Sequence, residues 1–234
     1  MSETVEIATE GGEFDAYVVG ASETPRPAVI VLQEIFGVSA GIRAKADHWA
    51  NAGYLASAPD LFWREGRGIT LDPEVPEDFQ RALGLMQATP IDGAVADIEA
   101  MIQALRARAD CNGMVGIVGY CWGGLLAYLA ATRTNASGCV SYYGGTIDKH
   151  LNEARAVARP LMLHIGEADA YIPANAQRAI VDALGSNPHV RVHIYPGADH
   201  AFARAGGAHR DEAAATLADA RTDAFFAEHL GIAR

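Results

Sequence analysis

The fold of the chain is indicated most clearly by the segment Met114-Val-Gly-Ile-Val-Gly-Tyr-Cys-Trp-Gly-Gly124. Its apolar first half predicts a buried strand, and the residues rich in alanine and leucine that follow it predict a helix. Gly119 and Gly123 stand at equal spacing on either side of Cys121. A sharp strand-to-helix turn needs small residues there, because larger side chains would collide around the strained central residue. This is the pattern of a nucleophile elbow with cysteine in place of serine.

Two other interpretations of the segment are a glycine-rich turn around a buried structural cysteine and a dinucleotide-binding loop. No G-x-G-x-x-G occurs in it, and it lies late in the chain, which disfavours the dinucleotide loop. On this motif alone the structural cysteine stays open. If Cys121 is a nucleophile, the N-terminus of the following helix favours a thiolate and a nearby oxyanion.

Similar apolar runs recur along the chain and alternate with helical patterns. The other predicted strands are 27–33, 54–58, 139–143, 161–166 and 190–195, and 5–9 and 14–19 predict an antiparallel hairpin. The predicted helices are 39–53 with Ser39 as N-cap, 91–105, 121–132, 173–184 and 212–230. This alternation predicts an α/β fold with a mostly parallel central sheet and helices on both faces. Without a repeat or a linker, we expect a single domain over 1–234.

Composition excludes several classes of protein. The chain has 234 residues with 18 Lys and Arg against 29 Asp and Glu, for a net charge of −11, and clustered basic residues are absent. We therefore expect no nucleic-acid partner. The three cysteines include no C-x-x-C pair, so they are interpreted as reduced thiols. We find neither a signal peptide nor an apolar run of about 20 residues, which predicts a cytoplasmic protein without a membrane partner.

Partners for Cys121 follow the later predicted strands. Asp169 follows 161–166, and His200 follows 190–195, which is the order nucleophile, acid, base that an elbow of this kind expects. Ligands of such sheets bind at the carboxyl ends of the strands. An isolated loop aspartate is also common as a turn or cap residue.

Three other residues compete for these roles. Glu167 stands close enough to replace Asp169 as the acid, and Asp199 adjoins the base. We expect Asp199 to point elsewhere and to tune the local potential. His164 lies inside an apolar strand, which favours a satisfied core imidazole.

The loop after 27–33 contributes further candidates. In this class of fold it supplies an oxyanion donor, so we assign the backbone N–H groups of Ile35 and Trp122 as the two donors. Glu34 is unusual at a strand end beside apolar residues, because its carboxylate needs a partner, and Arg204 is a candidate. The alternative is a surface ion pair with no catalytic part.

The sequence resembles the dienelactone hydrolase (carboxymethylenebutenolidase) family of α/β-hydrolases over nearly its whole length. The resemblance rests on Gln33-Glu-Ile-Phe-Gly-Val38, Ala58-Pro-Asp-Leu-Phe62, Val118-Gly-Tyr-Cys-Trp-Gly-Gly124, Tyr142-Tyr-Gly144, Asp169 with Pro173, and Gly197-Ala-Asp-His-Ala-Phe-Ala-Arg204. It implies the α/β-hydrolase fold, a Cys121, Asp169 and His200 triad, and hydrolysis of a carboxylated enol lactone, dienelactone giving maleylacetate. It also implies that Glu34 takes the thiol proton when substrate binds, and that Arg204 pairs with Glu34 and with the substrate carboxylate.

One segment departs from the family pattern. Where the typical member has a second carboxylate-binding arginine, a tyrosine and a tryptophan, this chain has Arg81 out of register, Leu83 and Met86. Arg81 is either a second carboxylate contact or a solvent-facing helix residue, and we favour the latter. The aliphatic pair makes the expected pocket wall less aromatic.

The leading hypothesis is therefore a cysteine-dependent lactone hydrolase with a thioester intermediate, acting on a small molecule and water as a monomer. Alternatives are a thiol carboxylesterase of the same fold that acts on a different ester, a catalytically silent binding module, and a thiol redox sensor, which would lack a resolving cysteine. We expect no cofactor and no metal, since H-E-x-x-H and similar ligand spacings are absent.

Overall fold

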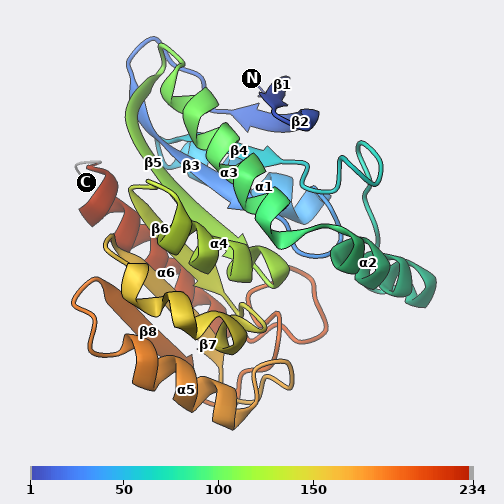
Figure 1. Ribbon diagram of the computed structural model, residues 1–234, viewed down its shortest axis with the longest axis vertical. Coiled ribbons are helices and arrows are strands. Elements are labelled where there is room, and N and C mark those ends of the chain that lie inside the picture. The colour runs from blue at the N-terminus through green and yellow to red at the C-terminus, as the bar shows by residue number, and fades with distance from the viewer. Residues whose placement is uncertain (1, 232–234) are drawn as a thin grey trace. The chain divides into compact units, whose positions relative to one another are not determined.

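The computed structural model describes residues 2–231 and forms two compact units, with the boundary between Ile117 and Val118. Each unit consists of strands with helices packed on both sides (Figure 1). The single domain predicted over 1–234 stays a prediction. No helix among residues 2–231 has the length and apolar character needed to cross a membrane.

The strands of the first unit are β1 (Ser2–Thr9), β2 (Gly12–Val19), β3 (Arg26–Leu32) and β4 (Leu55–Pro59), in the order β1-β2-β4-β3. The predicted hairpin is confirmed, since β1 and β2 pair antiparallel with Thr9 opposite Gly12. Strands β3 and β4 are parallel. Strand β3 is buried from Pro27 to Leu32, because a parallel strand with helices on both faces needs apolar residues on both.

The helices of the first unit are α1 (Ala40–Asn51), α2 (Pro76–Ala88) and α3 (Ile91–Arg106). Ser39 is the predicted N-cap of α1, and its side chain accepts a hydrogen bond from the Ile42 amide at 3.4 Å. Helix α1 contacts β3 and β4, whereas α3 contacts β1 and β3 from the opposite side (Figure 1). The predicted helices of this unit are thus confirmed.

Strand β5 (Cys111–Tyr120) crosses the boundary and leads into α4 (Trp122–Arg133). The rest of the second unit is β6 (Gly138–Tyr142), the 3-10 segment η1 (Ile147–Ala156), β7 (Leu161–Gly166), α5 (Ala174–Leu184), β8 (Val190–Tyr195) and α6 (Glu212–Leu230). Strands β6, β7 and β8 are parallel neighbours, with Leu161 opposite both Cys139 and Val190. Helices α4 and α5 lie on one side of these strands and α6 on the other (Figure 1).

Helix α4 is buried from Trp122 to Ala131, which explains why its sequence is apolar all round rather than amphipathic. The carboxyl ends of β7 and β8 lie at one edge because the strands are parallel and in register. The loops that carry Asp169 and His200 therefore start side by side.

Candidate active site

The turn between β5 and α4 has the strained backbone that the elbow pattern predicts. Cys121 is the N-cap of α4 with φ 55° and ψ −118°, a conformation that non-glycine residues rarely adopt. A Cβ atom on Gly119 would collide with the Gly123 carbonyl oxygen, so only glycine fits there. The predicted requirement for a small residue before Cys121 is thereby confirmed, and strain of this kind is typical of functional residues.

Close packing against β6 fixes the same turn from the other side. The Cys121 amide donates to the Tyr142 carbonyl oxygen at 3.0 Å. A Cβ atom on Gly124 would lie 2.6 Å from that same oxygen. The sulfur is thus carried by a rigid backbone at the N-terminus of a 12-residue helix, where the aligned peptide dipoles favour negative charge.

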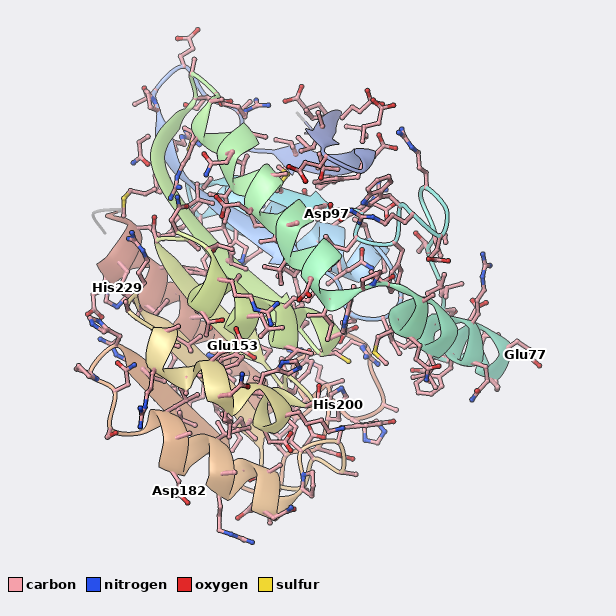
Figure 2. All side chains as sticks on the ribbon, in the orientation of Figure 1. Glu77, Asp97, Glu153, Asp182, His200 and His229 are labelled. Atoms are coloured by element: carbon pink, nitrogen blue, oxygen red, sulfur yellow. The ribbon has the colours of Figure 1, made fainter. Side chains whose placement is uncertain are left out.

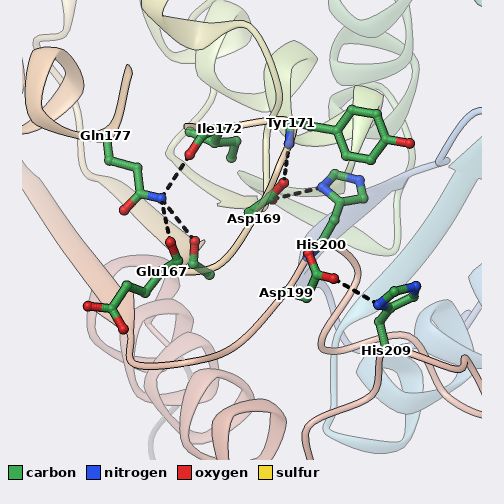
Figure 3. Close-up of polar contacts among 9 residues, drawn as sticks. Glu167, Asp169, Tyr171, Ile172, Gln177, Asp199, His200 and His209 are labelled. Atoms are coloured by element: carbon green, nitrogen blue, oxygen red, sulfur yellow. Dashed lines mark hydrogen bonds and ion pairs between the residues drawn. The ribbon is translucent and has the colours of Figure 1, made fainter. Parts of the chain in front are cut away.

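The loop after β7 holds Asp169 in a defined position. The Asp169 amide donates to Gly166 O at 3.3 Å, and the Ile172 amide donates to Asp169 O at 3.1 Å. The buried Gln177 side chain donates to the carbonyl oxygens of Gly166, Glu167 and Ile172 at 3.2, 3.1 and 2.8 Å (Figure 3). This bracing was not evident from the sequence, because Gln177 belongs to the next helix and has no motif of its own.

Two backbone hydrogen bonds tie this loop to the loop after β8. The Glu167 amide donates to Tyr195 O and the Ala168 amide to Ala198 O, each at 2.9 Å. Gly166 permits this approach, because a Cβ atom on it would lie 2.5 Å from Ala198 O. The acid and the base are therefore held on loops that are fixed relative to each other.

Asp169 and His200 form a direct pair. His200 Nδ1 lies 2.8 Å from Asp169 Oδ2, and the Tyr171 amide donates to Asp169 Oδ1 at 2.8 Å (Figure 3). An ionised carboxylate accepts only, so Nδ1 carries a proton. The other ring nitrogen, Nε2, is left for Cys121, with which His200 also has a side-chain hydrogen bond. The structure thus brings together the three residues predicted as a triad.

The electrostatics of this group favour a charged imidazole. Burial opposes protonation of His200, but the negative charge of Cys121 and hydrogen bonds to Asp169 and Cys121 outweigh burial and raise the pKa of His200 to about 10. The arrangement accordingly favours an imidazolium at His200 at neutral pH. A positive charge beside the Cys121 sulfur stabilises the thiolate that attacks the substrate.

Two aromatic rings border the imidazole, and neither was predicted from the sequence. Tyr143 is buried and meets the His200 ring edge-on at 5.2 Å between centroids, while Tyr171 does so at 4.7 Å. The Tyr171 side chain is exposed and extends beyond His200 (Figure 3). Ring packing of this kind comes from tertiary structure, so no local pattern signals it.

The three competing residues have other partners. Glu167 Oε2 accepts from the Gly197 amide at 3.0 Å. Asp199 accepts from the His200 amide at 2.6 Å and pairs with His209, so it does point elsewhere, as predicted. His164 is fully buried between Tyr195 Oη at 2.8 Å and Thr222 Oγ1 at 3.0 Å, which confirms its prediction as a core histidine.

The remaining predicted site residues are distributed over both units. Glu34 and Ile35 are buried directly after β3, and Arg81 is exposed on α2, all in the first unit. Trp122 opens α4, and Arg204 follows His200 in the second unit. The oxyanion pair of Ile35 and Trp122, the pairing of Glu34 with Arg204 and the substrate contact of Arg81 stay predictions.

Over residues 2–231, no group of three or more His, Cys, Asp or Glu side chains is placed to hold a metal ion. Figure 2 illustrates how such side chains are dispersed in the second unit, where Glu153 lies on η1, Asp182 on α5 and His229 on α6, whereas His200 lies on the loop after β8. The chemistry that Cys121 and His200 offer is nucleophilic attack by sulfur with proton transfer through an imidazole.

Comparisons with known proteins agree with this geometry. The family model of the "Dienelactone hydrolase family" matches residues 14–230. A "Putative carboxymethylenebutenolidase" of Azospirillum brasilense is 40% identical over 233 residues, which cover 96% of this chain and 97% of that protein. The carboxymethylenebutenolidase of Pseudomonas putida is 36% identical and covers 97% of both. The crystal structure of a "Putative Dienelactone Hydrolase" from Klebsiella pneumoniae superposes with a TM-score of 0.85 at 29% identity, over 97% of this chain and 98% of that one.

Proposed function

The chain belongs to the dienelactone hydrolase family, and on this premise we propose that it hydrolyses a carboxylated enol lactone, such as dienelactone, through a thioester on Cys121. Membership makes it a hydrolase that acts on esters or lactones, and the predicted α/β-hydrolase fold, with its mostly parallel strands and its helices on both faces, is confirmed. The observation that supports the mechanism is the His200 imidazole, which is hydrogen-bonded to Asp169 and whose pKa is raised by Cys121.

In the first step, the Cys121 thiolate attacks the lactone carbonyl carbon, and the carbonyl electrons move onto oxygen. The amides of Ile35 and Trp122 are the proposed donors to that oxyanion. When the tetrahedral intermediate collapses, the ring C–O bond breaks and leaves an enolate that stays attached through the acyl chain. Sulfur is itself easily expelled, so a thiol nucleophile suits an enolate leaving group better than an alkoxide or an amine.

Proton transfer follows from the charge of His200. The imidazolium gives its Nε2 proton to the departing enolate and becomes neutral. Neutral Nε2 then takes a proton from water, whose oxygen attacks the thioester carbon and releases the carboxylic acid and the thiolate. Asp169, which holds Nδ1–H, keeps the imidazole in the required tautomer throughout.

Recognition of the substrate carboxylate is assigned to Arg204, whose side chain lies on the loop that follows His200. A bidentate contact between guanidinium and carboxylate would overcome the long-range repulsion from a chain with a net charge of −11. Glu34 is proposed to pair with Arg204 and to accept the thiol proton when the substrate binds, as the family resemblance implies. Arg81 is the second proposed carboxylate contact.

A second candidate function is hydrolysis of a less acidic ester by the same thiol. It is favoured by Leu83 and Met86, which are half-buried aliphatic residues on α2 where the typical family member has aromatic ones. An aliphatic wall fits a planar conjugated lactone less closely than an aromatic one.

The test is the fall in ultraviolet absorbance as cis- and trans-dienelactone are hydrolysed, with a neutral aryl ester in parallel. We expect the wild type to hydrolyse the lactone and Cys121→Ala to be inactive. Cys139→Ala is the matched control, because Cys139 is a buried thiol on β6 without an elbow, and we expect it to retain activity. Turnover of the aryl ester alone would favour the second candidate, and lactone turnover by Cys121→Ala would overturn the mechanism.

A further inference from the structure

We propose that Asp199 and His209 position Arg204 relative to the catalytic base, and so act as positioning residues for the substrate carboxylate. The proposal rests on the carboxylate-binding role of Arg204 given above. It concerns one short segment of the second unit, in which the base His200 and the guanidinium of Arg204 lie a few residues apart.

Asp199 makes two contacts of different kinds. Its Oδ1 accepts a hydrogen bond from the His200 amide at 2.6 Å, which fixes the backbone that carries the base. Its Oδ2 lies 2.9 Å from Nδ1 of His209, which follows Arg204 in the sequence (Figure 3). One carboxylate therefore connects the backbone of the base to a residue beyond Arg204.

Other contacts close the loop between Phe202 and Asp211. The Asp211 amide donates to Phe202 O at 3.0 Å, and Arg210 Nη1 donates to Ala203 O at 3.4 Å. Asp211 then becomes the N-cap of α6, since its side chain accepts from the Ala214 amide at 3.0 Å. The C-terminal end of the loop is thus anchored to a helix, while the His209 to Asp199 contact anchors it to the turn of the base.

The turn inside the loop is shaped around the stem of Arg204. The Arg204 amide donates to Ala201 O at 2.8 Å, and the Gly207 amide donates to Arg204 O at 3.2 Å. A Cβ atom on Gly207 would lie 3.2 to 3.4 Å from Cβ, Cγ and Cδ of Arg204, so the aliphatic stem packs on the glycine backbone. The direction of the Arg204 side chain therefore depends on where the loop is held.

The contact between Asp199 and His209 is a side-chain link between this loop and the turn of the base, and its partners are 40% and 61% exposed. An exposed pair contributes little to folding, so its removal leaves the fold intact and loosens the loop. A displaced Arg204 weakens binding of a substrate carboxylate without changing attack by Cys121. The expected effect is a higher KM for a carboxylated lactone, about three- to five-fold, with kcat nearly unchanged.

The test compares Asp199→Asn and His209→Ala with the wild type on dienelactone and on a neutral aryl ester. Asparagine keeps an oxygen for the His200 amide and loses the charge that faces His209. We expect both variants to raise KM for the lactone alone, and the double variant to resemble either single one, because both remove the same link. His209→Arg keeps a hydrogen-bond donor opposite Asp199 and should leave KM nearer the wild-type value than His209→Ala does.

Matched controls are Asp182→Asn on α5 and His189→Gln before β8, both exposed positions of the same unit, which should leave both KM values unchanged. A second measurement is amide hydrogen exchange of residues 201–210, which requires no substrate. We expect faster exchange in Asp199→Asn and His209→Ala. Unchanged exchange, or an equal rise in KM for the neutral ester, would overturn the positioning role. If the wild-type enzyme hydrolyses no lactone, the proposed function is refuted. The hydrogen-exchange rates then test alone whether Asp199 and His209 hold the loop.

Discussion

His200 Nδ1 and Asp169 Oδ2 lie 2.8 Å apart, and the second oxygen of the same carboxylate is occupied by the Tyr171 amide. Each carboxylate oxygen of Asp169 thereby has a hydrogen-bond partner, and Nδ1 keeps its proton when the imidazole is neutral. The pair is fixed further by the backbone hydrogen bonds that join the two loops. The orientation of the base is therefore a property of the fold that exists before substrate binds.

Replacement of Asp169 by asparagine should remove this control while keeping the shape. An amide NH₂ turned toward Nδ1 would favour the wrong tautomer, and we expect kcat/KM to fall by about 10²- to 10⁴-fold, as for the acid of other triads. Glu167→Gln is the matched control, since Glu167 contacts the Gly197 amide rather than His200. Steady-state kinetics on the preferred substrate measure both, and equal loss in the two variants would refute the assignment.

The raised pKa of His200 predicts how Cys121 reacts with an alkylating agent. Because this pKa is raised to about 10, the imidazolium persists from acidic pH through neutrality and stabilises negative charge on the sulfur beside it, so iodoacetamide should alkylate Cys121 at pH 6 faster than it would without this neighbour. In His200→Ala the imidazolium is absent, so alkylation of Cys121 at pH 6 should slow by at least about ten-fold. The rate is measured from intact mass against time, and a wild type that reacts no faster than His200→Ala would contradict this stabilisation of the sulfur by His200.

Gly119→Ala should disrupt the elbow, because its Cβ atom would collide with the Gly123 carbonyl. The obstacle is backbone rather than a flexible side chain, so we expect a loss of stability of about 1–3 kcal/mol together with loss of activity. Gly145→Ala is the control, since nothing lies within 4 Å of an added Cβ atom there. Urea unfolding followed by circular dichroism measures the difference, and equal stability of the two variants would contradict the packing described for the elbow.

His164 should make the protein less stable in acid. Burial, followed by the nearby positive charges of His193 and Arg221, lowers the pKa of His164 well below its usual value. As pH falls below about 6.5, the unfolded chain binds a proton there that the folded chain does not, so the free energy of unfolding falls by up to about 1.4 kcal/mol per pH unit. His164→Gln should remove this part of the slope, whereas the exposed His189→Gln should retain it. Urea titrations from pH 5 to 8 test the difference, and parallel slopes for His164→Gln and the wild type would contradict it.

The sequence was informative where a local pattern determines structure. Strands β7 and β8 end where the apolar runs end, and α6 spans the predicted range, because burial on both faces leaves a clear apolar run or a clear helical period. Gly119 and Cys121 predicted the elbow correctly because the backbone there tolerates few types of residue. Asp169 and His200 could be found because each follows a strand in the expected order.

The sequence was uninformative where partners meet only in the folded chain. The segment η1 is short, mostly polar and kinked at His150, so it has no clear period. The ring of Tyr171 beside His200 and the carboxylate of Asp199 opposite His209 depend on how two loops fold together. The predicted monomer, cytoplasmic location and absence of a nucleic-acid partner stay predictions.

The most direct test of the central claim is to trap the acyl group on Cys121. Asp169→Asn, in which hydrolysis of the thioester should be slow, is mixed with dienelactone and quenched in acid at times from milliseconds to minutes, and intact mass is followed by peptide mapping. The enol stays attached when the ring opens, so we predict an adduct with the full mass of the lactone on the peptide that contains Cys121, sensitive to hydroxylamine. An adduct on another residue, or lactone turnover with Cys121 unmodified at every quench time, would contradict the account.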